Sequence, residues 1–304
     1  MKLTSEAFDR AKTFIQTQAR PLEQTLFAFH FENGSQDAVL TELSKFQHDN
    51  GGFGHALEPD CRMPDPSPLT TTVAFQIMRD INTPPDHPLI AKGIQYFLDT
   101  YDTQYQRWHW TLEAMNEHPR APWWTHNSDA LGEPSFRANP GAEIVGHLWH
   151  YSTHVPQDFL TQQTETTLNL LESLPAEMDM HDLLCYLHLL EANNLPDAER
   201  IQVGHKLLQA GPAIVTRDPK KWTTYSVKPL WLAPFPTSSL YDDLQNEVEL
   251  NLNYEIESQN EDGAWHPFWH WDNTYPEAWE TAKTEWKGVL TLKTLLSLKA
   301  FDRF

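Results

Sequence analysis

A seven-residue pattern occurs twice in this 304-residue chain, as QHDNGGF at residues 47–53 and as QNEDGAW at residues 259–265. Each copy has a glutamine, two polar residues, Asn or Asp followed by Gly, a small residue and an aromatic ring. Asn-Gly and Asp-Gly supply the left-handed conformation that ends a helix and turns the chain. The glutamine amide can bond backbone groups at the end of a neighbouring helix, and the aromatic ring packs over the turn. We therefore expect two equivalent corners between helices.

Apolar residues recur at three- and four-residue spacing along most of the chain, which is the period of an amphipathic helix. The pattern predicts helices at residues 5–18, 22–32, 36–47, 70–81, 88–100, 142–154, 158–173, 178–193, 197–210, 241–258 and 278–300. Alternation with a period of two, which is typical of strands, is nearly absent. Weaker copies of the corner at Gln106-Arg107-Trp108 and around Trp222 extend the repeat of helix pairs. We expect a single all-α domain over residues 1–304.

The Gln-x-x-x-Gly-small-aromatic pattern resembles the QW-type repeat of the terpenoid cyclase and protein prenyltransferase superfamily, whose domains are α/α toroids. The stretch FGHALEPD at residues 53–60 also resembles small bacterial prenyltransferase-like proteins. The resemblance implies a closed ring of about five or six helix pairs, in which the first and last repeats are neighbours. It also implies that the loops near Glu58 and Trp269 share one rim. A shared scaffold does not imply a shared reaction.

The catalytic motifs of those families are mostly missing from the sequence. Class II terpenoid cyclases protonate their substrate with Asp-x-Asp-Asp, and no such tetrad occurs. Protein prenyltransferases hold zinc with Asp-x-Cys and a distant His, whereas Asp60 and Cys61 are adjacent here. Asp242-Asp243 with Glu247 is similar to the Asp-rich magnesium motif of prenyl-diphosphate enzymes, but acidic residues are favoured in the first turn of any helix. The resemblance therefore indicates a scaffold and leaves the reaction open.

The charge of the chain excludes two classes of partner. Lys and Arg number 22 against 42 Asp and Glu, which gives a formal net charge of −20. Such a surface repels phosphate backbones and anionic lipid headgroups, so we expect no nucleic-acid binding and no membrane-surface role. No apolar stretch is long enough for membrane insertion. The N-terminus carries no signal-peptide pattern and two cysteines are too few for a disulfide framework, which predicts a cytoplasmic protein.

The first candidate site follows the first corner. His55, Glu58, Asp60 and Asp65 lie in a loop that several prolines stiffen, just before a predicted helix. Two carboxylates in different environments are what acid–base catalysis needs, so these four residues are the catalytic candidates. The alternative is a solvated loop whose side chains make local turn and capping bonds.

The second candidate site follows the second corner. Its ligand-binding candidates are aromatic and polar side chains that lie close together in the sequence: Trp265, His266, Trp269, Trp271, Glu277 and Trp279. Stacked rings beside carboxylates suit a sugar, an isoprenoid or a cation. The alternative is aromatic packing without a ligand, because Trp is highly buried in most proteins.

The third candidate site is a stripe along one predicted helix, formed by Glu143, His147 and His150 with His154 beyond them. A pair of such residues four positions apart can chelate zinc or another divalent ion, so these residues are the candidate metal ligands, although no cofactor is assured. A similar stripe comprises His181, Cys185 and His188. The alternative is a polar seam between helices.

Three functions remain open at this level. The first is a small-molecule ligand, apolar or isoprenoid, held in a central cavity lined by aromatic rings and carboxylates. The second is a carbohydrate-active toroid, a glycoside hydrolase or a polysaccharide lyase, because Trp and carboxylates also suit sugars. The third is a non-catalytic binding module that presents an acidic face to a basic partner. The sequence does not determine the oligomeric state.

Overall fold

The computed structural model describes residues 1–128, 132 and 135–304. Within those residues every regular element is a helix, and β-pairing is limited to three isolated bridges. The predicted all-α class is therefore confirmed for the described part of the chain. The chain divides into two compact units, unit 1 with Met1–Lys45 and Val215–Phe304, and unit 2 with Phe46–Ile214. The single closed toroid over residues 1–304 stays a prediction.

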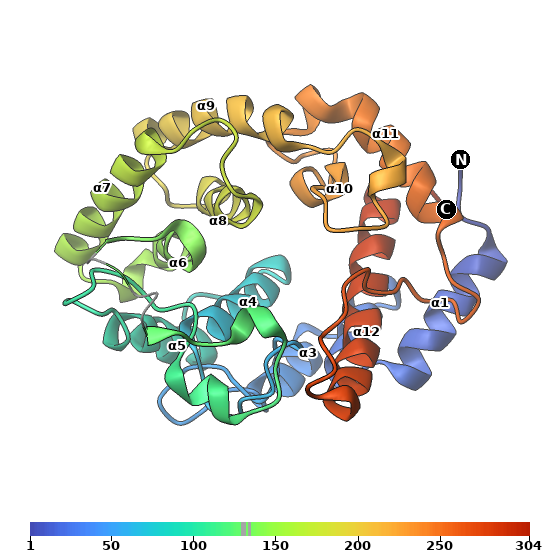
Figure 1. Cartoon of the computed structure of the whole chain (residues 1–304), viewed down its shortest axis with the longest axis horizontal. Coiled ribbons are helices and arrows are strands. Elements are labelled where there is room, and N and C mark those ends of the chain that lie inside the picture. The colour runs from blue at the N-terminus through green and yellow to red at the C-terminus, as the bar shows by residue number, and fades with distance from the viewer. Residues whose placement is uncertain (129–131, 133–134) are drawn as a thin grey trace. The chain divides into compact units, whose positions relative to one another are not determined.

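Unit 2 consists of helix pairs in two layers (Figure 1). The first layer contains three neighbouring helices, α4 (Pro68–Asp80), α6 (Ala138–His150) and α8 (Met180–Leu190). Each packs against the helix that follows it in the chain, respectively α5 (Pro88–Asp99), α7 (Gln157–Ser173) and α9 (Asp197–Ile214). The connections contain the 3₁₀ helices η1 (Glu113–Glu117), η2 (Pro122–Trp124) and η4 (Ser152–His154).

Aromatic rings hold the layers of unit 2 together. Phe75 of α4 and Phe97 of α5 are completely buried, with ring centroids 5.1 Å apart. The ring of Tyr151, just beyond α6, meets Phe75 edge to face at 5.7 Å. Such offset and edge-to-face contacts are the favoured geometries of aromatic pairs, so these side chains bury area and also fix the spacing of three helices.

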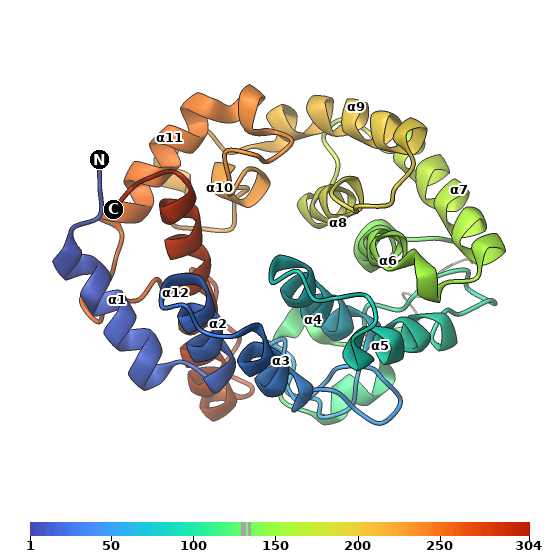
Figure 2. The same cartoon turned by 180° about the vertical axis from the view of Figure 1, so that it is seen from behind.

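Unit 1 combines the two ends of the chain. Its elements are α1 (Ser5–Gln18), α2 (Pro21–Phe31), α3 (Gln36–Ser44), η5 (Pro219–Lys221), α10 (Pro229–Leu232), α11 (Tyr241–Glu257) and α12 (Pro276–Ala300). The long helix α12 packs against both α1 and α2, as Figure 2 shows from behind, and α10 packs against α11. The Leu3 amide donates to the Arg303 carbonyl at 2.6 Å, and the rings of Phe8 and Phe304 are 5.2 Å apart. The first and last helices are therefore direct neighbours within unit 1.

Most predicted helices are confirmed, with ends that shift by no more than four residues. The helix predicted at 142–154 begins at Ala138 and ends at His150, so His154 lies in η4 instead. Helix α1 is capped by Thr4, whose side chain accepts from the Ala7 amide at 3.2 Å. The helix α10 was not predicted, because four residues are too few to display a helical period.

The two corners have the same backbone geometry. Gly51 and Gly263 have φ angles of +90° and +85°, in the region that side chains disfavour. In the first copy the His48 amide donates to the carbonyl of the residue after the glycine at 2.9 Å, and in the second copy Asn260 does the same at 3.1 Å. The predicted turn is therefore confirmed in both copies.

The corner glutamines also act alike. Gln47 donates from Nε2 to the carbonyl of the turn glycine at 3.0 Å and to Leu89, in the first turn of α5, at 3.1 Å. Gln259 donates to its own turn glycine at 2.9 Å and to Ala7, in the first turn of α1, at 2.8 Å. Each glutamine therefore ties a turn to the start of another helix, as expected from the sequence.

A threonine completes each corner, and the sequence pattern did not include it. Thr71 Oγ1 in α4 accepts from the amide of Phe53 at 3.0 Å, and Thr291 Oγ1 in α12 accepts from the amide of Trp265 at 3.0 Å. The first corner thus joins α4 and α5, and the second joins α12 and α1. The first helix of the chain completes the pair that the last helix begins.

Candidate functional site

Four aromatic side chains of unit 1 form an unbroken line of ring contacts, which we call the aromatic row: Trp231, Phe268, Trp269 and Trp286. Trp231 stacks on Phe268 with centroids 5.7 Å apart. Phe268 meets Trp269 edge to face at 5.1 Å, and Trp269 meets Trp286 in the same way at 5.0 Å. All four side chains are partly exposed, so the row presents apolar surface to solvent.

The row is assembled from three parts of unit 1. Trp231 lies on the short helix α10, Phe268 and Trp269 lie in the segment after the second corner, and Trp286 lies on α12. Of these residues the sequence singled out only Trp269. Trp286 follows Trp279 by seven positions, a spacing that places both residues on one side of a helix. This spacing could have identified Trp286 from the sequence. Trp231 offered no such signal, because α10 has no detectable period.

The remaining predicted tryptophans are buried. Trp265, Trp271 and Trp279 are only 4%, 1% and 2% exposed, respectively. Trp265 donates from Nε1 to the Glu255 carbonyl at 2.9 Å, and the rings of Trp271 and Trp279 are 5.7 Å apart. Burial favours the packing alternative for these three side chains. Trp269 is therefore the predicted tryptophan best placed to contact a ligand.

Two indole nitrogens in this region have no hydrogen-bond acceptor among the described residues. They are Nε1 of Trp279 and Nε1 of Trp286, and both atoms are buried. A buried donor without a partner is costly, and such groups are uncommon in folded proteins. The described part of the protein therefore leaves two hydrogen-bond donors without acceptors in the interior next to the aromatic row.

His266 and Glu277 have separate environments. His266 Nε2 lies 2.9 Å from Asp262 Oδ2, and Lys287 Nζ lies 3.0 Å from the same oxygen. Burial raises the pKa of Asp262, but the hydrogen bonds from Lys287 and His266 outweigh it and leave the pKa below its ordinary value. His266 thus belongs to the ion pairs of the second corner. Glu277 is exposed in the first turn of α12, where a carboxylate suits the helix dipole.

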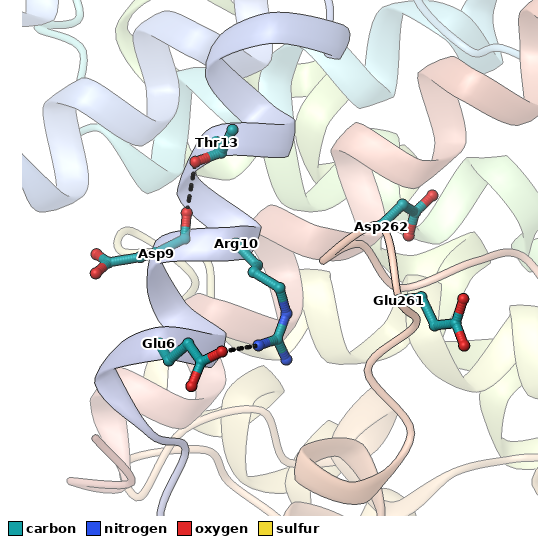
Figure 3. Close-up of a pocket in the computed structure, with 6 residues that line it drawn as sticks. All are labelled: Glu6, Asp9, Arg10, Thr13, Glu261 and Asp262. Atoms are coloured by element: carbon teal, nitrogen blue, oxygen red, sulfur yellow. Dashed lines mark hydrogen bonds and ion pairs between the residues drawn. The ribbon is translucent and has the colours of Figure 1, made fainter.

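A surface pocket of about 470 Å³ lies between α1 and the second corner (Figure 3). Its lining is mostly acidic, with Glu6, Asp9, Glu261 and Asp262 beside Arg10 and Thr13. Arg10 contacts Glu6 at 3.5 Å and donates to Gln259 Oε1 at 3.0 Å, so the one cation of the lining is already paired. The described residues that line this pocket include no aromatic ring, and we therefore place the candidate ligand site at the aromatic row.

The predicted catalytic loop of unit 2 is tightly folded. His55 and Ala56 have φ angles of +52° and +57°, a left-handed conformation that is uncommon for residues other than glycine. The His55 amide donates to the Pro64 carbonyl at 2.8 Å, and the His55 ring stacks on His48 at 4.3 Å. His55 and Asp65 are exposed at the surface of the loop.

The two other catalytic candidates of this loop are buried. Glu58 is 7% exposed and Asp60 is 3% exposed, so the solvated-loop alternative is wrong for them. The Asp60 carbonyl accepts from the Ala121 amide at 2.8 Å, which anchors the loop to the segment after η1. Burial raises the pKa of the neighbouring Cys61 thiol to about 11, which keeps it protonated at neutral pH. The catalytic role of Glu58 and Asp60 stays a prediction.

The predicted stripe on α6 splits in the structure. Glu143 and His147 are buried and in contact, with His147 Nε2 3.3 Å from Glu143 Oε1. His150 turns away, and its Nδ1 accepts from the Asn193 amide at 3.4 Å. Burial, with a contribution from Arg79, lowers the pKa of His150 to about 4.

The second stripe meets the first across the contact of α6 with α8. Cys185 Sγ lies 3.9 Å from Glu143 Oε2, and His188 Nε2 lies 4.0 Å from Glu143 Oε1. Gln76, on α4, donates to Glu143 Oε1 at 2.6 Å and was not predicted. Across the described residues, no group of three or more His, Cys, Asp and Glu side chains has the arrangement that a metal ion requires. The divalent metal stays a prediction.

Within the part of the chain that the structure describes, no helix has the length and apolar character needed to cross a bilayer. No protein-family model, no curated protein and no solved structure matches this chain.

Proposed function

We propose that the chain is a helical ligand-binding protein that holds an apolar, isoprenoid-like ligand along the aromatic row of unit 1. The observation that carries this proposal is the unbroken contact of four partly exposed rings. Exposed apolar surface of this extent costs free energy in water, and a bound hydrocarbon removes that cost. An extended row fits an extended chain better than it fits a compact ligand.

We also propose that the two units close into an α/α toroid of five or six helix pairs, as the family resemblance implies. The matching hydrogen bonds of the two corners support this architecture, because they indicate one repeated helix pair. A small-angle scattering curve that fits only an open arrangement of the units would exclude it. The two free, buried cysteines fit a reducing compartment and support a cytoplasmic location.

The central experiment measures the binding of farnesol and geranylgeraniol by quenching of tryptophan fluorescence. Neutral alcohols are the right probes, because a chain with a net charge of −20 repels diphosphates. Geranylgeraniol has five more carbons than farnesol. At about 0.8 kcal/mol per buried CH₂, and with half of the added surface buried, it should bind about 30-fold more tightly.

Trp269→Ala removes a ring from the middle of the row and should weaken the binding of both alcohols by at least tenfold. Trp123→Ala is the matched control, because Trp123 is 41% exposed and lies in unit 2. Failure of both alcohols to bind, or equal losses in the two variants, would refute the proposal. Binding of an oligosaccharide that Trp269→Ala abolishes, without binding of either alcohol, would favour the carbohydrate-active alternative.

Glu58 and Asp60 are the proposed acid–base residues if the bound ligand is also transformed. Glu58→Gln keeps the size of the side chain and removes its proton-transfer capacity at neutral pH. We expect this variant to bind the alcohols as the wild type does and to lose any turnover of an isoprenoid substrate, measured by chromatography of the products. Turnover that survives in both Glu58→Gln and Asp60→Asn would exclude the assignment.

A further inference from the structure

A buried carboxylate in the first layer of unit 2 has no Lys or Arg partner among the described residues. Glu143 is 6% exposed, and its Oε1 accepts from the Gln76 amide at 2.6 Å and lies 3.3 Å from His147 Nε2. Its Oε2 faces the Cys185 thiol at 3.9 Å. Three helices, α4, α6 and α8, therefore aim polar side chains at one carboxyl group.

Arg79 determines how His147 contributes to this cluster. Arg79 Nη1 lies 3.5 Å from His147 Nδ1, and a guanidinium group can only donate hydrogen bonds. His147 Nδ1 is therefore the acceptor, and the ring carries its proton on Nε2, which faces Glu143. Burial lowers the pKa of His147 well below its ordinary value, and Arg79 and His150 lower it further. His147 is a neutral donor to Glu143 and not a counter-ion.

Cys185 is neutral as well. Burial raises the pKa of its thiol well above the ordinary value, and the charge of Glu143 raises it further. The thiol hydrogen can point at Glu143 Oε2, but thiols are weak donors. Arg79 is directed at His147 and at the His188 carbonyl, which it meets at 3.1 Å.

Two other buried glutamates show what a purely structural carboxylate looks like in this protein. Glu23 is 2% exposed and lies 2.6 Å from Arg20, and Glu255 is 7% exposed and lies 3.0 Å from Lys228. Among the described residues, no Lys or Arg makes such a contact with Glu143. Buried carboxylates are rarely left without a cation, because desolvation of the charge is expensive.

We propose that Glu143 anchors a second ligand site on α4, α6 and α8 that takes a cationic group, specifically a protonated amine. The ammonium group of such a ligand supplies the cation that no described Lys or Arg places there. Gln76, Arg79 and His188 are each partly exposed, so the cluster reaches the surface. His188 lies 4.0 Å from Glu143 Oε1 and borders the approach. The net charge of −20 attracts cations to the molecule.

The test compares Glu143→Gln with Glu255→Gln, which change the net charge equally. Without ligand, Glu143→Gln should keep or raise the melting temperature, because it removes a buried carboxylate that has no Lys or Arg partner and keeps the acceptor for Gln76. Glu255→Gln should lower it by on the order of 10 °C, because Lys228 loses its partner. A comparable drop in both variants would show that Glu143 is only structural and would overturn the proposal.

The binding arm uses n-butylammonium chloride at constant ionic strength, with n-butanol as the neutral control. At a hundred times the dissociation constant, the wild type should melt on the order of 5 °C higher. Glu255→Gln should show the same rise, Glu143→Gln should show none, and butanol should have no effect. An equal rise in Glu143→Gln, or no rise in the wild type, overturns the proposal.

If Glu143→Gln does not fold, Glu143→Asp serves instead. It keeps the charge, withdraws the carboxylate from Gln76 by one methylene, and should weaken butylammonium binding by at least tenfold. Unchanged affinity in this variant overturns the proposal. The outcome is independent of the aromatic row, which lies in unit 1 and is probed with uncharged alcohols.

Discussion

Alanine in place of the corner glycines should destabilise the protein far more than alanine at an ordinary left-handed glycine. Gly51 and Gly263 have φ angles of +90° and +85°, and a side chain in the left-handed region costs about 1–2 kcal/mol. A Cβ at Gly51 would collide with the Lys92 carbonyl oxygen, and one at Gly263 would lie 2.5 Å from the Arg10 carbonyl oxygen. These are helix backbone atoms, which cannot rotate away.

Such overpacking costs about 1–3 kcal/mol. The reduced entropy of the unfolded chain returns about 0.4–1 kcal/mol. The net expected loss for Gly51→Ala or Gly263→Ala is therefore about 1–4.6 kcal/mol, a large part of the roughly 5–15 kcal/mol that holds a typical domain folded. Similar losses at the two sites are expected, because the two corners share one geometry.

Gly132→Ala is the matched control. Gly132 also has a positive φ, +65°, but a Cβ there would meet no atom of the described residues within 4 Å. Only the conformational cost remains, and the net loss should be about 0–1.6 kcal/mol. Urea unfolding followed by far-ultraviolet circular dichroism measures all three variants. If either corner variant loses no more stability than Gly132→Ala, the inference that the corner glycine lies against the backbone of a neighbouring helix is wrong.

Three further predictions concern hydrogen bonding, pH and thiol reactivity. Thr71→Val and Thr291→Val each leave a buried backbone amide without its acceptor and should each cost about 1–3 kcal/mol in urea unfolding; a loss below 0.5 kcal/mol would contradict this. Because the folded-state pKa of Asp262 lies below its ordinary 3.8, its contribution to stability is present above about pH 4 and disappears as pH falls through the folded pKa. Asp262→Asn keeps the side-chain oxygen that accepts in the turn, since the first corner has Asn50 in the equivalent place. The melting temperature of this variant should therefore change less with pH below pH 4 than that of the wild type. Parallel curves of melting temperature against pH for the two proteins would rule this out. Cys61 and Cys185 are buried with raised pKa values, so at pH 8 Ellman's reagent should label them only after unfolding; immediate labelling of the native protein would contradict their burial.

Residue type in the sequence identified many of the candidate site residues, but it did not show which of them lie together in the structure. The sequence identified Trp269 and the stripe of Glu143 with His147, and both lie where polar or aromatic side chains gather. It also listed Trp265, Trp271 and Trp279, which are buried. Residue type cannot distinguish a buried ring from an exposed one, because Trp serves both packing and binding.

The partners of Glu143 illustrate the same limit. Gln76, from α4, and Cys185, from α8, reach Glu143 only because their helices flank α6 in one layer. Each is one of several polar residues in its helix, and nothing in its local sequence indicates which other helix it will face. Rotation of either helix by one residue would direct the side chain elsewhere.

The sequence by itself determined the helical class, the positions of most helices and the two corners. These features depend on local rules: a period of 3.6 residues, and a left-handed glycine after Asn or Asp. The tertiary structure alone decided that the first helix completes the pair begun by the last, which rings form the aromatic row, and that no described Lys or Arg pairs with Glu143. Those outcomes depend on how distant helices pack, and packing is set by the fit of whole surfaces rather than by any short stretch of chain.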